Sequence, residues 1–128
     1  MLLFPGEAEL YAGRRDWIIR RAAGGLLAVC PGRCDRDERP LACRMFPLLP
    51  REGDDGKVRV VTDQRARAVC PLARQGRSAM DPAFIEAVRQ AGEILFADSE
   101  QAAFLRMLAG EQDELKQLRR MLGGGKHD

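Results

Sequence analysis

The chain has 128 residues, of which 45% are hydrophobic and 31% charged, with a formal net charge of +2. This length suits one domain with a modest core, and no stretch approaches the roughly 18 apolar residues of a membrane-spanning helix. The first residues also lack the basic start and long apolar run of a secretory signal, so we expect a cytoplasmic protein with no membrane partner.

Positive charge is concentrated in the middle of the chain. Between Arg14 and Arg77 there are fourteen arginines and one lysine against eight acidic residues. Three interpretations are open: the arginines offset the charge of a thiolate-bound metal, they face a polyanion, or they form an ordinary solvated surface. The single tryptophan and single tyrosine offer few stacking platforms, which argues against nucleic acid as the partner.

The first quarter of the chain is predicted to form a short helix and a hairpin. A helix is expected over 4–11, because Pro5 suits a first helical position and acidic residues follow it. The segments 17–21 and 26–29 are rich in strand-forming residues. Two glycines between these segments supply the positive φ angles of a tight turn.

The middle of the chain alternates between turns and short elements. A single helical turn is expected over 40–45, whereas Pro47 and Pro50 limit the next segment to pairing at a sheet edge. After a Gly-Asp-Asp-Gly turn, alternating apolar and polar residues make 57–62 the clearest strand of the chain. The segment 65–77, which holds the last cysteine, is predicted to be a loop.

The last third is predicted to be helical, with Asp81 and Asp98 each in a capping position before a helix. In the first helix, apolar residues at helical spacing should face the core: Phe84, Val88, Ala91 and Leu95. A second stripe, in either one kinked helix or two, continues through Phe104, Leu108, Leu115, Leu118 and Leu122. This stripe either packs on the small sheet or binds a protein partner or a second copy of the chain.

Together these elements predict an α+β fold, a small irregular metal-stapled domain with a short antiparallel sheet and C-terminal helices. Residues 1–77 would form a cysteine-rich metal-binding region with hairpins, and 78–122 the helical support of the same domain. The glycine-rich end, 123–128, is predicted to be a disordered tail.

The four cysteines follow the spacing C-x3-C-x8-C-x26-C. Cys30 and Cys34 lie on a Pro-Gly turn at a separation that suits two ligands of one structural zinc ion, and Cys43 and Cys70 would complete the site. In a reducing cytoplasm such clusters bind metals more often than they form disulfides. Four thiolates suit Zn²⁺, and they equally suit an iron–sulfur cluster. The only histidine, His127, lies in the tail and is a poor candidate for a further ligand.

Two other interpretations of the cysteines are open. All four could be small buried thiols that bind nothing. Alternatively Cys30 and Cys34 could form a redox pair, although their gap is one residue longer than in the C-x-x-C motif. The proline, glycine and arginine residues beside the cysteines favour the metal site over scattered core thiols.

The sequence R-P-L-A-C-R-M-F-P-L over 39–48, with two cysteines before it and Cys-Pro-Leu at 70–72, resembles a bacterial family of zinc- or iron-chelating domains. That family is grouped with the flagellin lysine N-methylases. The segment L-F-P-G-E at 3–7 is similar to one that precedes the cysteines in a subgroup of the family. The resemblance implies that the four cysteines are the chelating set. It also implies that the signature includes Arg39, Pro40, Arg44 and Pro47.

From the residues and this resemblance we expect a cytoplasmic metal-binding module with a structural or accessory role. Arg39 and Arg44 would lie at the site and offset thiolate charge. The alternative is a component of a protein-modifying, methyltransferase-like or redox enzyme that uses an iron–sulfur cluster. Members of that family often have denser cysteine clusters, so this chain should hold one metal ion or one cluster. It would be a minimal version of the family or one that lacks an N-terminal piece.

Overall fold

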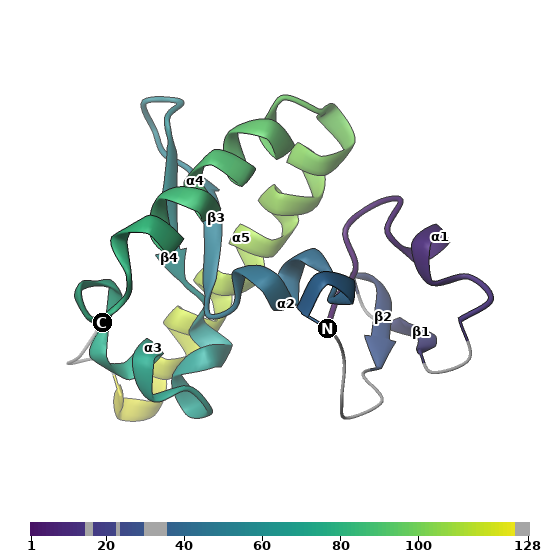
Figure 1. Ribbon diagram of the computed structural model, residues 1–128. Coiled ribbons are helices and arrows are strands. Elements are labelled where there is room, and N and C mark those ends of the chain that lie inside the picture. Colours follow the sequence, from purple (N-terminus) through teal and green to yellow (C-terminus); the bar gives the residue numbers. More distant parts are fainter. Residues whose placement is uncertain (15–16, 23, 30–35, 125–128) are drawn as a thin grey trace. The chain divides into compact units, whose positions relative to one another are not determined.

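The computed structural model describes residues 1–14, 17–22, 24–29 and 36–124 (Figure 1). It confirms a mixed α and β fold with short antiparallel strand pairs and C-terminal helices. The strands form two separate two-stranded sheets. The chain divides into two compact units, 1–46 and 47–128, and each is described by itself below.

The first unit contains the predicted hairpin. Strand β1 (Ile18–Ala22) pairs antiparallel with β2 (Gly25–Val29), and Ile18 lies opposite Val29. Gly24 and Gly25 have φ angles of 90° and 146°, which residues other than glycine rarely adopt. The start of the chain runs along the free edge of β2, where the amide of Leu3 donates to the carbonyl of Leu26 over 2.9 Å.

The N-terminal helix is shorter than the expected 4–11, because α1 spans only Ala8–Tyr11. Residues 4–7 form a turn in which the amide of Glu7 donates to the carbonyl of Phe4 over 3.0 Å. Proline at the second position of this turn and Gly6 at the third, with φ of 88°, match a type II turn. The proline therefore starts a turn here and not a helix.

A small core holds the first unit together. It consists of Leu3, Tyr11, Trp17 and Ala28, and Ala8 and Ile19 pack against it. The ring centroids of Tyr11 and Trp17 are 4.9 Å apart, with a tilted arrangement of 55°. After a 3-10 turn, η1 (Arg36–Glu38), the predicted helical turn is present as α2 (Leu41–Met45).

The second unit begins with a hairpin of β3 (Leu48–Glu52) and β4 (Val58–Thr62), which confirms the strand predicted over 57–62. Pro50 lies inside β3 opposite Val60. Both strands of a two-stranded sheet are edges, so the missing amide hydrogen of proline is tolerated there.

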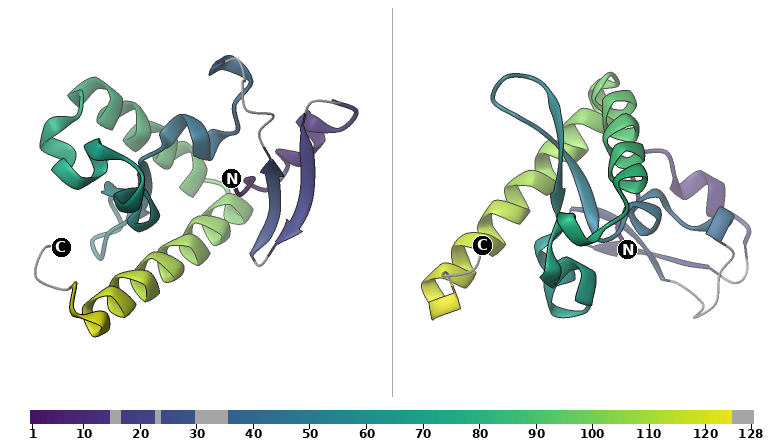
Figure 2. Two further views of the ribbon diagram at one scale, coloured as in Figure 1. Left: turned by 90° about the horizontal axis from the view of Figure 1, so that it is seen from below. Right: turned by 60° about the vertical axis from the view of Figure 1, so that its left-hand side comes forward.

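Two long helices pack against this hairpin, α4 (Pro82–Phe96) and α5 (Ser99–Arg119) (Figure 2). The predicted caps are confirmed: Asp81 accepts from the amide of Ala83 over 2.9 Å, and Asp98 accepts from the amide of Gln101 over 3.0 Å. Helix α5 continues through Gly110 as one helix. In the part of the chain that the structure describes, no helix has the length and apolar character needed to cross a membrane.

The buried face of α5 differs from the predicted stripe. Its buried residues are Ala102, Leu105, Leu108 and Gln112. By contrast, the end of the predicted stripe is exposed, at 36% for Leu115, 50% for Leu118 and 79% for Leu122. Only the first two-thirds of α5 therefore contribute to the core of the second unit, and a π-helical turn, η4 (Arg120–Gly124), follows it.

The segment predicted to be a loop over 65–77 is instead mostly helical. It contains η2 (Gln64–Ala68), α3 (Pro71–Gln75) and the start of η3 (Arg77–Ala79). Asp63 caps η2 by accepting from the amide of Arg65, and Pro71 occupies the first turn of α3, where its missing amide hydrogen costs nothing. These local signals produce short helices, and the arginines are compatible with them because arginine is a good helix former.

Candidate metal centre

The structure describes two of the four predicted ligands. Cys43 lies inside α2 in the first unit, and Cys70 directly precedes α3 in the second. Both residues are half-buried. Cys30 and Cys34 lie outside the described residues, as does His127.

Cys43 is held by the backbone of the residues just before it. Its amide donates to the carbonyl of Pro40 over 3.0 Å, and the amide of Arg44 reaches the same oxygen over 3.1 Å. Pro40 is fully buried and Met45, at the other end of the helix, is 3% exposed. The five-residue helix is thus anchored at both ends while Cys43 remains partly accessible.

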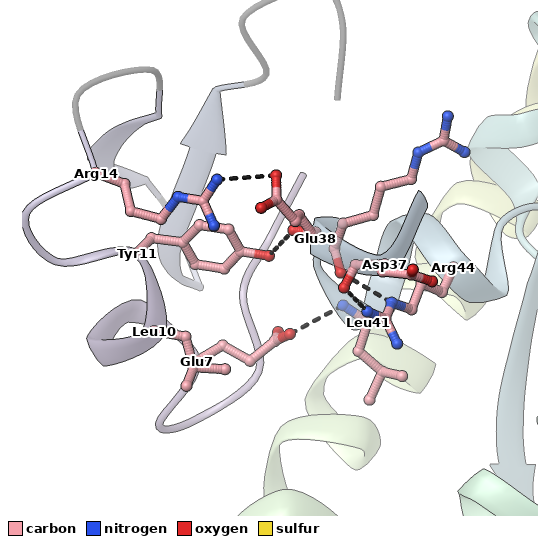
Figure 3. A pocket seen from close by; sticks show the side chains of 9 residues that line it. Glu7, Leu10, Tyr11, Arg14, Asp37, Glu38, Leu41 and Arg44 are labelled. Atoms are coloured by element: carbon pink, nitrogen blue, oxygen red, sulfur yellow. Dashed lines mark hydrogen bonds and ion pairs between the residues drawn. The ribbon is translucent and has the colours of Figure 1, made fainter. Parts of the chain in front are cut away.

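Arg44, one of the two arginines predicted at the site, folds back over the turn before α2. Its Nε atom donates to the carbonyl of Arg39 over 3.1 Å, and its Nη2 atom donates to the carbonyl of Asp37. Arg39 is half-buried and lines a cavity of about 310 Å³ together with Arg44 (Figure 3). Two guanidinium groups therefore belong to residues within four positions of Cys43.

Residues of the N-terminal segment form the opposite wall of this cavity. The hydroxyl of Tyr11 donates to the carbonyl of Glu38 over 2.6 Å, and Arg14 forms an ion pair with the carboxylate of Glu38 over 2.9 Å. Burial raises the pKa of the Tyr11 hydroxyl, and the charge of Glu7 raises it further. Tyr11 is therefore a protonated donor at neutral pH.

Cys70 occupies the N-cap position of α3. Its amide donates to the carbonyl of Ala66 over 2.8 Å, and its carbonyl accepts from the amide of Ala73 over 3.1 Å. Ala66 is fully buried, so this backbone contact connects Cys70 to the core of the second unit. The neighbouring side chains are apolar and exposed, at 73% for Val69 and 45% for Leu72.

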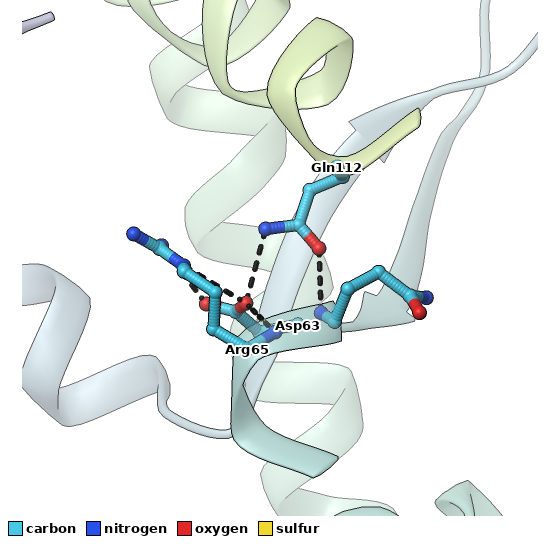
Figure 4. A network of polar contacts seen from close by, with 4 residues as sticks. Asp63, Arg65 and Gln112 are labelled. Carbon is cyan, nitrogen blue, oxygen red and sulfur yellow. Dashed lines mark hydrogen bonds and ion pairs between the residues drawn. The ribbon is translucent and has the colours of Figure 1, made fainter. Parts of the chain in front are cut away.

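A buried polar network fixes the start of the segment that leads to Cys70 (Figure 4). The Asp63 carboxylate accepts from the amide of Arg65 over 2.9 Å, from the Arg65 guanidinium over 3.1 Å and from Nε2 of Gln112 over 3.0 Å. Oε1 of Gln112 accepts from the amide of Gln64 over 2.6 Å. Asp63 and Gln112 are each 5% exposed. Gln112 of α5 therefore fixes the start of η2 through these hydrogen bonds. Cys70 lies two residues after the end of η2.

The described residues contain no group of three or more histidine, cysteine, aspartate or glutamate side chains close enough together to hold a metal ion. Two of the four predicted thiols lie outside those residues, so the ligand set as a whole stays a prediction. The chemistry of the two described donors fits Zn²⁺ or an iron–sulfur cluster, because both take thiolate ligands and neither cysteine is fully buried.

Three residues with a structural role beside the cysteines were missed in the sequence: Glu7, Asp63 and Gln112. Asp63 had a detectable signal, because an aspartate before a short polar segment is a frequent N-cap. Glu7 belongs to the L-F-P-G-E segment, whose pattern also suits the start of a helix. Gln112 carried no local signal, since its partners are 48 and 49 residues away along the chain.

Comparisons of this chain with protein-family models, with curated proteins and with solved structures find no match.

Proposed function

We propose that the chain is a metal-binding module in which Cys30, Cys34, Cys43 and Cys70 hold one Zn²⁺ ion or one iron–sulfur cluster. Its role is structural or accessory. The proposal places the chain with the zinc- or iron-chelating domains that its cysteine region resembles.

The partial exposure of Cys43 and Cys70 carries this proposal. A cysteine that serves only to fill a core is usually fully buried, because its side chain behaves as a small hydrophobic group. Both described cysteines are half-buried, and each lies on or directly before a short helix that hydrogen bonds fix in place. Ordered backbone beside an accessible thiol is what a metal ligand requires, since the sulfur must be both reachable and positioned.

The charges near Cys43 support the same proposal. Four thiolates around a divalent cation carry about −2 in total, and nearby cations stabilise such a site. Arg44 follows Cys43 directly, and its guanidinium is held against the turn that precedes α2. Arg39 belongs to that turn and lies between Glu38 and Pro40 in the sequence. When bound, the metal would supply part of the folding free energy of this small protein.

Metal analysis of anaerobically purified protein tests the proposal. We expect about one zinc ion or one iron–sulfur cluster per chain. Replacing Cys43→Ser and Cys70→Ser separately should each release the metal, whereas Ser78→Ala, at an exposed position of η3, should leave it bound. A folded wild-type protein without metal would contradict the proposal, as would full metal retention in both cysteine variants.

An absorbance spectrum of the same sample separates this proposal from the enzyme alternative. A visible iron band, together with one cysteine that alkylates rapidly, would favour a protein-modifying or redox component that uses a cluster. A colourless zinc protein with slowly reacting thiols would favour the structural role.

A further inference from the structure

The carboxylate of Glu7 joins two segments that are far apart in the sequence. Its Oε1 atom accepts from the amide of Phe4 over 2.6 Å, and its Oε2 atom accepts from the amide of Leu41 over 2.9 Å. Leu41 is the first residue of α2, the helix that carries Cys43 (Figure 3). Glu7 therefore occupies the place of a capping side chain for a helix whose own N-cap residue, Pro40, makes no side-chain hydrogen bond.

The turn 4–7 explains how Glu7 reaches that place. Pro5 and Gly6 are the middle residues of the turn. Oε1 of Glu7 accepts a hydrogen bond from the amide of Phe4, the first residue of the turn. Phe4 is 3% exposed, so the first residue of the turn is buried. Each residue of the P-G-E sequence thus has a role in presenting one carboxylate to the start of α2.

Two further side chains of the N-terminal segment contact the residues just before α2. Tyr11, four positions after Glu7, donates to the carbonyl of Glu38, and Arg14, three positions later, pairs with the Glu38 carboxylate. Glu7 precedes α1, Tyr11 is its last residue and Arg14 follows it, and all three side chains bond to the stretch 38–41. The segment 38–41 is therefore held at both ends, at Glu38 by Tyr11 and Arg14 and at Leu41 by Glu7.

We propose that Glu7 is a positioning residue for the thiol of Cys43, and that the L-F-P-G-E segment exists to hold this metal-ligating helix in place. This inference rests on the proposed metal-binding function. A helix of five residues is not stable alone, so its orientation must come from outside contacts. The carboxylate supplies a charge-assisted hydrogen bond at the positive end of the helix, where anions are favoured.

Chelator competition with Glu7→Ala tests the inference, with Glu9→Ala as the matched control. Glu9 carries the same charge on α1 but is exposed, and its side chain forms no hydrogen bond or ion pair within the part of the chain that the structure describes. We expect Glu7→Ala to weaken metal retention at least tenfold, the usual effect of losing a residue that orients a ligand, and Glu9→Ala to leave it unchanged.

Alkylation of the reduced, metal-free protein, followed by peptide mass spectrometry, separates positioning from general loosening. Glu7→Ala should raise the alkylation rate of Cys43 and not that of Cys70, which lies in the other unit. Equal acceleration at both thiols would overturn the inference. If Glu7→Ala does not fold, both assays are made with Glu7→Gln, whose amide oxygen still accepts one of the two hydrogen bonds. Metal retention and a Cys43 alkylation rate equal to those of the wild type would then overturn the inference.

The two proposals fail in different ways. A folded wild-type protein that binds no metal overturns the proposed function and this inference together. A wild-type protein that binds metal, with a Glu7→Ala variant that binds it equally tightly, overturns the inference alone.

Discussion

The buried carboxylate of Asp63 accepts a 3.0 Å hydrogen bond from Nε2 of Gln112, a side chain of α5 that is itself only 5% exposed. The pair joins the end of the β3–β4 hairpin to a helix 49 residues further along the chain. Because Oε1 of the same glutamine accepts from the amide of Gln64, one side chain satisfies a buried carboxylate and a partly buried amide.

Replacing Gln112→Leu should therefore destabilise the protein by about 1–3 kcal/mol, because the Asp63 carboxylate loses one of its hydrogen bonds and the amide of Gln64 loses its partner. Urea unfolding measures the change. The control is Gln117→Leu, at an exposed position of the same helix, which should change stability by less than about 0.5 kcal/mol. Equal effects of the two substitutions would show that the buried network contributes little.

The glycines of the two long helices should respond oppositely to alanine. A Cβ atom at Gly92 of α4 would lie 2.5 Å from Cβ of Pro50 and 2.8 Å from Cγ1 of Val58. We expect Gly92→Ala to cost about 1–3 kcal/mol in unfolding free energy, since the hairpin must move away from α4. Gly110→Ala in α5 meets no atom within 4 Å and should stabilise the protein by about 0.5–1 kcal/mol. Destabilisation by both substitutions would contradict this.

Elements with local signals were predictable from the sequence. The β1–β2 hairpin depends on Gly24 and Gly25, and the start of α4 depends on Asp81 followed by proline. Errors arose where a local pattern fits two structures. Pro5 suits a helix start and a turn equally, and the positive φ of Gly6 decides for the turn.

Features that depend on distant contacts were not predictable. The exposed end of α5 has the same apolar spacing as its buried part, and only the length of the packed elements determines where burial stops. Likewise, no local pattern marks Gln112 as the partner of Asp63. For the candidate site, the sequence predicts the cysteines as ligands. The contacts of Glu7 with the start of α2, and of Gln112 with the segment that leads to Cys70, are visible only in the structure.

Tyr11 should titrate above its ordinary pKa of about 10. Burial is the main cause, and the charge of Glu7 adds to it. Tyr11 is the only tyrosine, so the ultraviolet absorbance of tyrosinate reports its ionisation directly. Because the folded-state pKa is the higher one, the stability that depends on the protonated hydroxyl is complete below about pH 10 and is lost as the pH rises through the folded-state pKa.

The comparison for Tyr11 is the same titration in denaturant, where the pKa should return to about 10. Tyr11→Phe should abolish the absorbance change and cost about 1 kcal/mol at neutral pH, since the hydrogen bond to the carbonyl of Glu38 is lost. A pKa in the folded protein at or below the value in denaturant would contradict the buried placement of the hydroxyl.

The ion pair of Arg51 and Asp113 should contribute little to stability despite its good geometry. Two hydrogen bonds of 2.8 Å join the guanidinium to the carboxylate, but the side chains are 35% and 59% exposed. The hydrogen bond from Arg51 lowers the pKa of Asp113 below its ordinary value. For a carboxyl group with a lowered pKa, the contribution is present above the unfolded-state pKa and disappears as the pH falls through the folded-state pKa. We therefore expect Asp113→Asn to cost less than about 1 kcal/mol at pH 7, because solvent screens the pair.

Urea unfolding of this variant and the wild type across the acidic range tests both parts of the prediction. The difference between them should shrink as the pH falls below the ordinary range of aspartate, and it should also decrease with added salt. Glu114→Gln is the control, because it removes the same charge at an exposed position of α5 where the side chain has no hydrogen bond or ion pair among the described residues. A cost for Asp113→Asn that is large and independent of pH would mean that the carboxylate contributes through packing and not through its charge.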